Sequence, residues 1–303
     1  MAKENSGVIA TSPNLRSQSL GEGSKAKKRK RVWEIDFLRG FFLTGVLLFH
    51  LAYDFSALPY VFYNFYEVAP WDFIKFSAWV SDVIYNPDMI WGVRFFSGGF
   101  LVITGISCAF SRNNLVRGLK ILAVAYLITL ATAILTYLLD TDMFIAFGIL
   151  HCIGFSLIVV GLIEWVEIKV GHRLSAWIVL GLGLAIWALG YWFIYGLGAE
   201  DMVLPVEDLT PWGYLRVMFG LEVMSGDTFG LVPNAGKILV GVALGRLLYE
   251  KNKASLLPRL DGRWGKPLEF MGRHTFAFYI LCQPVYILIL AAVLLPQGFR
   301  IWF

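Results

Sequence analysis

Long apolar runs, separated by short polar segments, organise this chain from residue 33 onward. Each run is about the length that a helix needs to cross a bilayer core of roughly 30 Å. The runs are continuously apolar rather than alternating, so they predict membrane-spanning helices and not barrel strands. We predict seven spans, at residues 33–53, 91–110, 117–139, 143–164, 174–197, 229–249 and 273–295.

The composition agrees with this pattern. Hydrophobic residues make up 57% of the 303 residues and charged residues only 16%, whereas about 25% of an ordinary soluble domain is charged. The sequence therefore predicts an all-α polytopic membrane protein, with residues 32–303 as a single membrane-embedded bundle of about seven helices. Residues 1–31 are polar at first and then basic, and they predict a disordered cytoplasmic tail.

Basic side chains are distributed unevenly among the connections. They gather in the N-terminal tail and in the second, fourth and sixth connections, whereas acidic residues dominate the others. Cytoplasmic loops carry an excess of Lys and Arg, so this asymmetry predicts a cytoplasmic N-terminus and a C-terminus outside. The net charge of +4 is therefore a topology signal, and it does not indicate nucleic acid as a partner.

Four polar residues lie along one face of the first span. Arg39 and His50 are eleven residues apart, which is about three helical turns, so both face the same side about 16 Å apart along the axis. Asp36 and Asp54 extend this stripe at its two ends. Ionisable side chains are costly inside a bilayer, so the stripe is a candidate functional site.

The stripe has a functional and a structural interpretation. His50 is the candidate general base, and Asp54, one turn on, is the candidate group that orients its imidazole. Arg39, with Asp36, is the candidate binding site for an anionic donor entering from the cytoplasm. Structurally, His50 and Asp54 would only satisfy each other as a helix-end pair, and Arg39 would reach toward the interface or pair with Asp36.

Polar residues in other spans are candidates for the same site. Those predicted to make cavity or oxyanion contacts are Arg94, His151, Lys237, His274 and Gln283. Each is individually more often structural, although a lysine near mid-membrane is costly without a partner. Neither a metal nor a disulfide is predicted, because all three cysteines fall inside spans and lack metal-ligand spacing: Cys108, Cys152 and Cys282.

Two loops on the predicted outer side are long and rich in aromatic residues. Within residues 54–90 the stretch 72–85 predicts an interfacial helix, and within residues 198–228 the stretch 212–224 is amphipathic. Such rings are typical of the aromatic belt at a membrane surface. The alternative is an acceptor cleft in which aromatic faces stack on sugar rings.

Several stretches resemble one known family. The run EIDFLRGFFLTGVLLFHLAYDFS, at 34–56, resembles the opening of the membrane-embedded catalytic domain of heparan-α-glucosaminide N-acetyltransferases. The likeness continues through residues 95–121, 140–156 and 272–285, with the run DMFIAFGILH typical of a bacterial branch. The chain departs from the pattern at Cys282, where a histidine often precedes Gln-Pro, and at Asn234–Ala235, where an aromatic pair is usual.

This resemblance implies a multi-pass acyltransferase of a bacterial or archaeal cytoplasmic membrane. It implies transfer of an acetyl or short acyl group from acetyl-CoA, as co-substrate and without a metal, to a carbohydrate at the outer face. His50 would be the catalytic base, and Arg39 would handle the donor. The implied partners are acyl-CoA, a glycan or glycolipid acceptor and membrane lipids, with the oligomeric state left open.

The charged stripe also fits a second function. A transporter or flippase for a polar lipid or sugar would line its path with the same residues. Such a protein has no reason to bind acyl-CoA, whereas a transferase requires it. A purely structural membrane subunit would not be expected to carry so many ionisable groups inside its spans.

The predicted orientation can be tested with a reporter fused after Phe303. An alkaline phosphatase fused there should be active, because the charge asymmetry places the C-terminus outside the cytoplasm. A fusion at the same position to a fluorescent protein that matures only in the cytoplasm should stay dark. The reverse pair of results would overturn the side assigned to every residue of the stripe.

Overall fold

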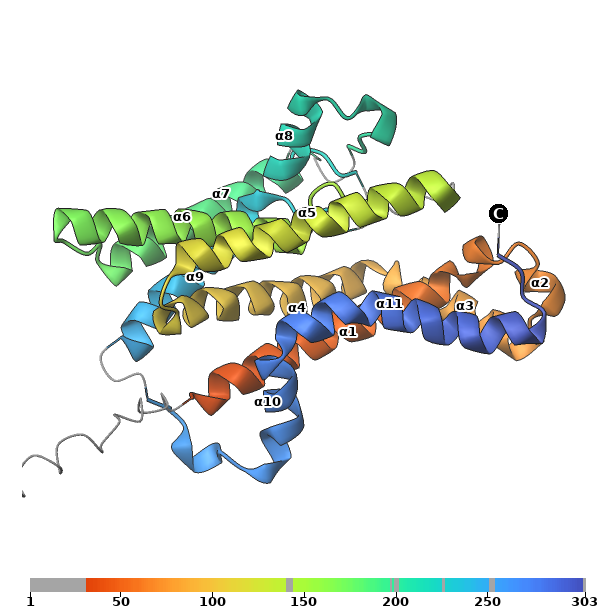
Figure 1. Ribbon diagram of the computed structural model, residues 1–303, viewed down its shortest axis with the longest axis horizontal. Helices are drawn as coiled ribbons and strands as arrows, with labels where there is room; N and C mark the ends of the chain where they lie inside the picture. Colours follow the sequence, from red (N-terminus) through yellow and green to blue (C-terminus); the bar gives the residue numbers. More distant parts are fainter. Residues whose placement is uncertain are drawn as a thin grey trace, which may run out of the picture. The chain divides into compact units, whose positions relative to one another are not determined.

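Seven helices in the described part of the chain are long and apolar enough to cross a membrane, and they confirm the predicted all-α bundle (Figure 1). They are α1 (Trp33–Val61), α4 (Pro87–Ile106), α5 (Asn114–Leu139), α6 (Ile149–Val170), α7 (Ala176–Gly196), α9 (Leu231–Tyr249) and α11 (Thr275–Leu294). The 3-10 helix η1 (Ser107–Phe110) continues α4.

The structure, a computed structural model, describes residues 31–139, 144–196, 198, 202–224, 227–250 and 254–301. The predicted cytoplasmic tail lies outside these residues, apart from Arg31. All of the described helices lie within the unit Val32–Phe303. The orientation of this unit in the membrane stays a prediction.

Two spans differ from their predicted bounds by more than four residues. The helix α1 has 29 residues, because it continues past Asp54 and Pro59 instead of ending where the polar residues begin. The helix α6 begins at Ile149, six residues later than predicted, because Gly148 before it is extended, with φ −94° and ψ −174°. Hydropathy indicates how long an apolar segment is. It does not indicate whether the first residues of that segment are extended or helical.

Short helices occupy the connections. They are α2 (Phe65–Val68), α3 (Trp71–Ile84), η3 (Val206–Asp208), α8 (Pro211–Phe219), η4 (Pro258–Leu260), η5 (Arg263–Gly265), α10 (Lys266–Arg273) and η6 (Leu295–Gln297). The helix expected at 72–85 is α3, and its Trp71 and Trp79 are exposed. The amphipathic stretch at 212–224 forms only the shorter α8, because Gly220 ends it in the left-handed conformation, with φ 82°.

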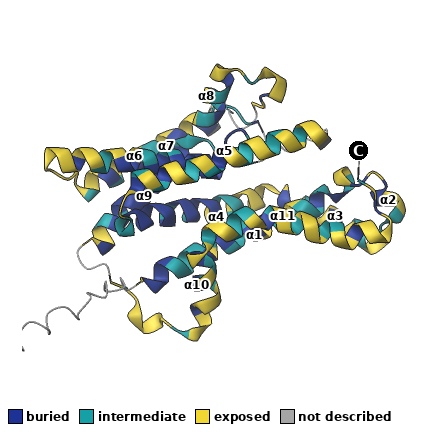
Figure 2. Cartoon of the chain, in the orientation of Figure 1, coloured by how far each residue is buried: buried dark blue, intermediate teal, exposed yellow. Residues whose placement is uncertain are grey.

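The buried centre of this unit lies where α4 meets α9. The helix α9 packs against α4, α6 and α7, while α1 packs against α4, α10 and α11, and α5 packs against α6 (Figure 1). Buried residues concentrate on α9 and the adjoining part of α4, whereas α5, α7 and α11 expose many large apolar side chains (Figure 2). Such exposed apolar faces are expected where helices contact lipid.

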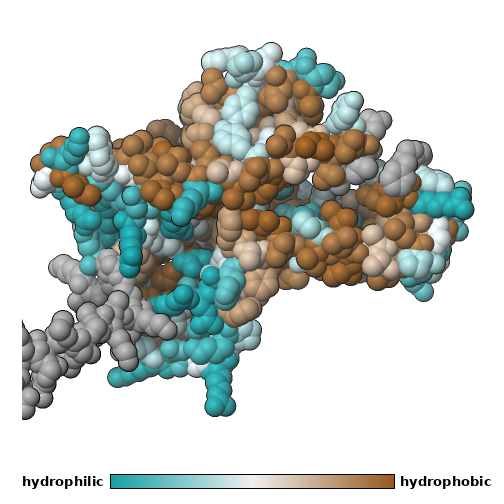
Figure 3. Space-filling model, in the orientation of Figure 1, coloured by the Kyte–Doolittle hydropathy of each residue, from teal (hydrophilic) through white to brown (hydrophobic). Residues whose placement is uncertain are grey.

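Polar residues are most numerous at one end of the spans. Figure 3 shows hydrophilic side chains at the left, where α10 and the start of α1 lie, and hydrophobic side chains along the helices. We call this the Arg39 end, and we call the opposite half of α1 the His50 end. By the helical rise, the two residues are about 16 Å apart along α1.

Glycine allows α4 and α9 to approach closely. A Cβ on Gly105 would overlap the carbonyl oxygen of Ile238, and a Cβ on Gly241 would overlap that of Val102. Small residues at such crossings let two membrane helices pack backbone against backbone. The central helix pair therefore depends on these two positions.

We expect Gly105→Ala to destabilise the protein by about 1–3 kcal/mol, the usual range for overpacking, because backbone must move to admit the methyl group. The measurement is thermal unfolding of the purified protein in detergent. Gly181→Ala is the matched control, since a Cβ at Gly181 meets nothing within 4 Å. Equal melting temperatures for the two variants would contradict the importance of this crossing.

Candidate active site

The imidazole of His50 is turned back along α1. Its Nδ1 lies 2.8 Å from the carbonyl oxygen of Val46. A carbonyl can only accept a hydrogen bond, so Nδ1 carries the ring proton and the neutral ring has its lone pair on Nε2. The side chain is 14% exposed. The Val46 carbonyl thus fixes the tautomer of His50, and Nε2 is the nitrogen that can act as a base.

Asp54 does not form the hydrogen bond to His50 that the sequence predicted. The Val46 carbonyl takes that place, and Asp54 accepts a hydrogen bond from Gln283 Nε2 on α11 at 3.3 Å. Helical side chains point toward the helix N-terminus, so His50 reaches the carbonyl one turn before it. Asp54 still lies close enough for its carboxylate to interact electrostatically with His50.

A second acid, Asp227, lies near the other ring nitrogen of His50. Its Oδ1 is 4.0 Å from Nε2, and its side chain is 47% exposed. This distance is too long for a hydrogen bond, but a carboxylate there stabilises the imidazolium that forms when Nε2 accepts a proton. Sequence reasoning missed Asp227, because it follows Ser225 and Gly226 in a connection whose spacing does not relate it to α1.

The helix α11 brings further polar groups to His50. The ring of Tyr279 stands edge-on to the imidazole, with centroids 6.2 Å apart. Gln283 precedes the intrahelical Pro284. Asp54 Oδ2 and Gln283 Oε1 are both buried without a hydrogen-bond partner among the described residues. The structure therefore brings together three predicted site residues, His50, Asp54 and Gln283, and adds Asp227.

Arg39 joins three elements at the other end of the stripe. Its Nη1 donates to Asp36 Oδ1 at 3.0 Å and to the Gly272 carbonyl of α10 at 3.1 Å. Its Nη2 donates to Ser107 Oγ in η1 at 2.7 Å. The pairing with Asp36 is the one that the structural interpretation of the stripe predicted. The side chain of Arg39 remains 20% exposed.

His274 lies where α10 gives way to α11, away from His50. Its Nδ1 is 2.9 Å from the carbonyl oxygen of Phe270, and the side chain is exposed. Because α10 also supplies the carbonyl that binds Arg39, His274 belongs to the Arg39 end. It therefore contributes nothing to the group around His50.

Lys237 and Arg94 form a separate basic pair on α9 and α4. Lys237 is 5% exposed, and its Nζ donates to Asn234 Oδ1 at 2.8 Å. Arg94 lies over the ring of Trp91, 5.2 Å from its centroid, and is an electrostatic neighbour of Lys237. This pair places two positive charges inside the spans.

His151 has both of its ring nitrogens in hydrogen bonds. The Gly148 N–H donates to Nδ1 at 3.2 Å, so the proton is on Nε2, which lies 3.2 Å from Thr129 Oγ1. The Thr129 hydroxyl in turn donates to the Ile145 carbonyl at 2.8 Å. This chain of bonds fixes the start of α6 against α5, which gives His151 a structural role.

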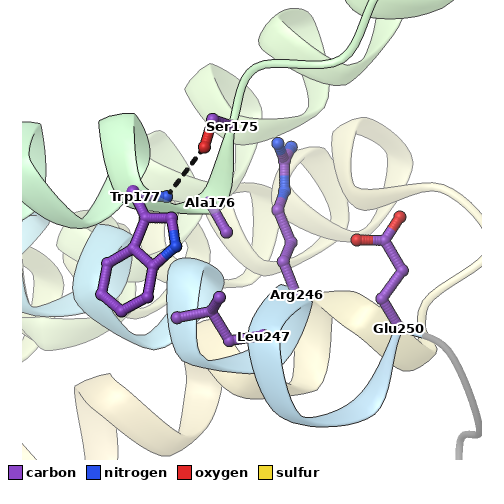
Figure 4. Close-up of a pocket in the computed structure, with 6 residues that line it drawn as sticks. All are labelled: Ser175, Ala176, Trp177, Arg246, Leu247 and Glu250. Atoms are coloured by element: carbon purple, nitrogen blue, oxygen red, sulfur yellow. Dashed lines mark hydrogen bonds between the residues drawn. The ribbon is translucent and has the colours of Figure 1, made fainter.

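A surface hollow lies at the basic end of α7 and α9. Figure 4 shows its lining: Ser175, Ala176, Trp177, Arg246, Leu247 and Glu250. The guanidinium of Arg246 makes two bonds to Glu167, at 2.8 and 3.0 Å, and Glu250 pairs with Arg173. Its charged groups are thus already neutralised, and the hollow adds no reactive group.

No group of three or more His, Cys, Asp or Glu residues able to hold a metal ion occurs within the described ranges. The three cysteines are buried and free, as predicted. The polar groups that the structure gathers near His50 are two carboxylates, Asp54 and Asp227, and the amide of Gln283.

One protein family matches this chain over most of its length. The family described as heparan-alpha-glucosaminide N-acetyltransferase, catalytic, matches residues 31–83 and 69–284. The chain belongs to this family. The match includes α1 with its polar stripe, the α4–α9 centre and the Gln283 turn of α11. No curated protein and no solved structure matches the chain.

Membership in the heparan-alpha-glucosaminide N-acetyltransferase family makes the chain a membrane acetyltransferase by family. The seven apolar helices agree with a multi-pass integral membrane protein. The resemblance read from residues 34–56, 95–121, 140–156 and 272–285 is thereby confirmed.

We expect Asp227→Asn to slow acetyl transfer about fivefold, because removing a half-exposed carboxylate near His50 loses about 1 kcal/mol of imidazolium stabilisation. The measurement compares kcat of the variant and of the wild type at a saturating concentration of donor. Asp208→Asn, an exposed acid in the same connection, is the control and should leave kcat unchanged. Identical rates for the two variants would exclude Asp227 from the site.

Proposed function

We propose that this protein transfers an acetyl or short acyl group from acyl-CoA to a hydroxyl or amine of a carbohydrate at the extracytoplasmic face. The observation that carries the proposal is the contact between His50 Nδ1 and the Val46 carbonyl oxygen, 2.8 Å apart. The Nδ1–H of His50 donates to that carbonyl, so the free Nε2 can take a proton from an acceptor. The family of the chain supports acetyl transfer as the reaction.

The reaction balances with His50 as the only base. His50 Nε2 takes the proton of the acceptor O–H or N–H while the acceptor atom bonds to the acyl carbon. The C–S bond of the thioester then breaks, and the departing thiolate takes the proton from the imidazolium. Asp227 and Asp54 stabilise the positive charge on the ring between these steps, and Asp54 acts through space rather than by a hydrogen bond.

Donor and acceptor approach His50 from opposite ends in this proposal. The basic Arg39 end meets the phosphates of CoA, with Arg39 and Asp36 at the mouth. The distance of about 16 Å along α1 is comparable to the length of an extended pantetheine arm, so the thioester would reach His50. Gln283, which donates to Asp54 beside His50, is the candidate for stabilising the developing oxyanion.

The proposal is tested by incubating purified protein with labelled acetyl-CoA and cell-envelope glycans. We expect label to appear in the glycans, and His50→Gln to lower the rate by about 10²–10⁴-fold, the usual contribution of a general base. His172→Gln, at an exposed histidine in the α6–α7 connection, is the matched control. A His50→Gln variant with normal turnover would make the base assignment wrong.

Binding separates the transferase from a transporter or flippase. A transferase must bind acetyl-CoA in the absence of acceptor. Saturable binding of labelled acetyl-CoA by the purified wild type supports the first function. Its absence, together with transport of a polar lipid in vesicles, would support the second.

We expect Arg39→Gln to raise the Kd for acetyl-CoA and also to lower the melting temperature. The first effect follows from loss of the charge that meets the donor, and the second from loss of the three hydrogen bonds to Asp36, Gly272 and Ser107. Affinity is measured well below the melting temperature of the variant.

Arg112→Gln is the matched control, since Arg112 is an exposed arginine in the η1–α5 connection. It removes the same charge without disturbing the contacts of Arg39. If Arg39→Gln only melts early and binds acetyl-CoA as the wild type does, Arg39 is a structural residue and plays no part in donor binding.

A further inference from the structure

The connection from α9 to α11 ends in a segment, residues 256–273, that carries large apolar side chains at the surface. It contains η4, η5 and α10. The apolar residues of the segment that are at least 50% exposed are Leu256, Leu257, Leu260, Trp264 and Phe270. Exposed apolar side chains that are close together and bordered by polar ones mark places where a protein meets a membrane or a partner.

The same segment carries basic side chains that its acids do not neutralise. Its two acids, Asp261 and Glu269, both pair with Lys266, at 2.8 and 2.9 Å from Nζ. The exposed arginines of the segment are Arg259, Arg263 and Arg273. None of these three enters an ion pair with an acid in the part of the chain that the structure describes. Their guanidinium groups are therefore available to an external anion.

The segment lies at the level where the spans end. The helix α10 runs across the direction of α11 (Figure 1), and it packs closely on α1. A Cβ on Gly40 of α1 would overlap the carbonyl oxygen of Leu268, and a Cβ on Gly272 would overlap that of Asp36. The helix α11 begins at Thr275, directly after His274. A helix placed in this way at the end of the spans lies in the headgroup region of a bilayer.

Aromatic rings join the segment to the first turns of two spans. The ring centroid of Trp264 is 5.0 Å from that of Phe37 and 6.2 Å from that of Trp33, both on α1. The ring of Phe270 is 6.0 Å from that of Phe278 on α11. The apolar side chains of the segment thus continue the lipid-facing surface of the spans. Aromatic and basic residues together at this level are typical of helices that lie in the membrane interface.

We propose that the 256–273 segment binds the headgroups of anionic phospholipids in the leaflet at the Arg39 end. Its three exposed arginines bind the phosphate oxygens, and its exposed apolar side chains insert among the upper parts of the acyl chains. A water-soluble anion would neutralise the arginines but leave five large apolar side chains in water, so a lipid fits the segment better. The site is independent of the proposed transfer, since lipid binding requires neither acyl-CoA nor His50.

The test is calorimetric titration of the purified full-length protein, in a neutral detergent, with short-chain lipids. Dioctanoyl phosphatidylglycerol should bind saturably and about tenfold or more tightly than dioctanoyl phosphatidylcholine, which has the same chains and no net charge. Glycerol 3-phosphate, which has a phosphate and no chains, should not bind measurably. A phosphatidylglycerol affinity equal to that for phosphatidylcholine would make the proposal wrong.

The arginines are tested together in the triple variant Arg259→Gln/Arg263→Gln/Arg273→Gln. Each basic residue at a membrane surface contributes about fivefold to binding of an anionic lipid, so the triple variant should lose about 10²-fold in affinity for phosphatidylglycerol. The control removes the same charge from exposed residues of two other connections: Arg112→Gln/Lys120→Gln/Lys169→Gln. It should change the affinity by less than about threefold, because those residues lie outside the segment.

A single apolar variant tests the insertion of the segment. Leu260 is 53% exposed, and Leu260→Gln should weaken binding of both lipids about fivefold, because about half of a leucine side chain is lost from contact with acyl chains. Unchanged binding of both lipids would contradict insertion.

Two further results would overturn the proposal. If the control triple variant loses as much affinity as the arginine variant, only the overall charge of the protein attracts the lipid. If the arginine variant binds phosphatidylglycerol as the wild type does but binds acetyl-CoA more weakly, the arginines serve a soluble nucleotide instead. Because the lipid readout is binding, failure of the proposed acyl transfer would not produce either result.

Discussion

Inside a bilayer a polar side chain has no water to bind, so it must find its partner within the protein. The partners that the polar side chains of α1 find within the protein determine the geometry of the site. At one end Arg39 is held by Asp36, Gly272 and Ser107, which ties α1 to α10 and η1. At the other end the Val46 carbonyl holds Nδ1 of His50. That bond leaves Nε2 free, and the proposed chemistry follows from it.

The seven spans could be predicted because a bilayer requires apolar length, and the sequence shows length directly. The start of α6 could not, since it depends on the extended backbone at Gly148. The stripe from Asp36 to Asp54 was predictable from helical spacing. The partner of His50 was not, because a backbone carbonyl one turn back competes with the carboxylate one turn on. Asp227 reaches His50 only through tertiary packing, which no spacing in the sequence reveals.

The polar groups of this protein therefore fall into three sets with different duties. The set at Arg39 joins helices and offers a charge at the basic end. The set at His50 joins α1 to α11 through Asp54 and Gln283 and presents a base. Lys237 and Arg94, on α9 and α4, form a basic pair in which Lys237 donates to Asn234. The family of the chain makes it a membrane acetyltransferase. The first two sets support the proposal that the donor binds at the Arg39 end of α1 and that its acyl group is transferred at His50.

The most direct test of this account is the sidedness of the reaction in sealed proteoliposomes of known protein orientation. Acetyl-CoA is supplied only on the side of the Arg39 end, and the glycan acceptor only on the side of the His50 end. The account predicts acetylated glycan in this arrangement and none when the two substrates are exchanged. Transfer that requires both substrates on the same side would contradict the proposal that donor and acceptor meet at His50 from opposite ends of α1.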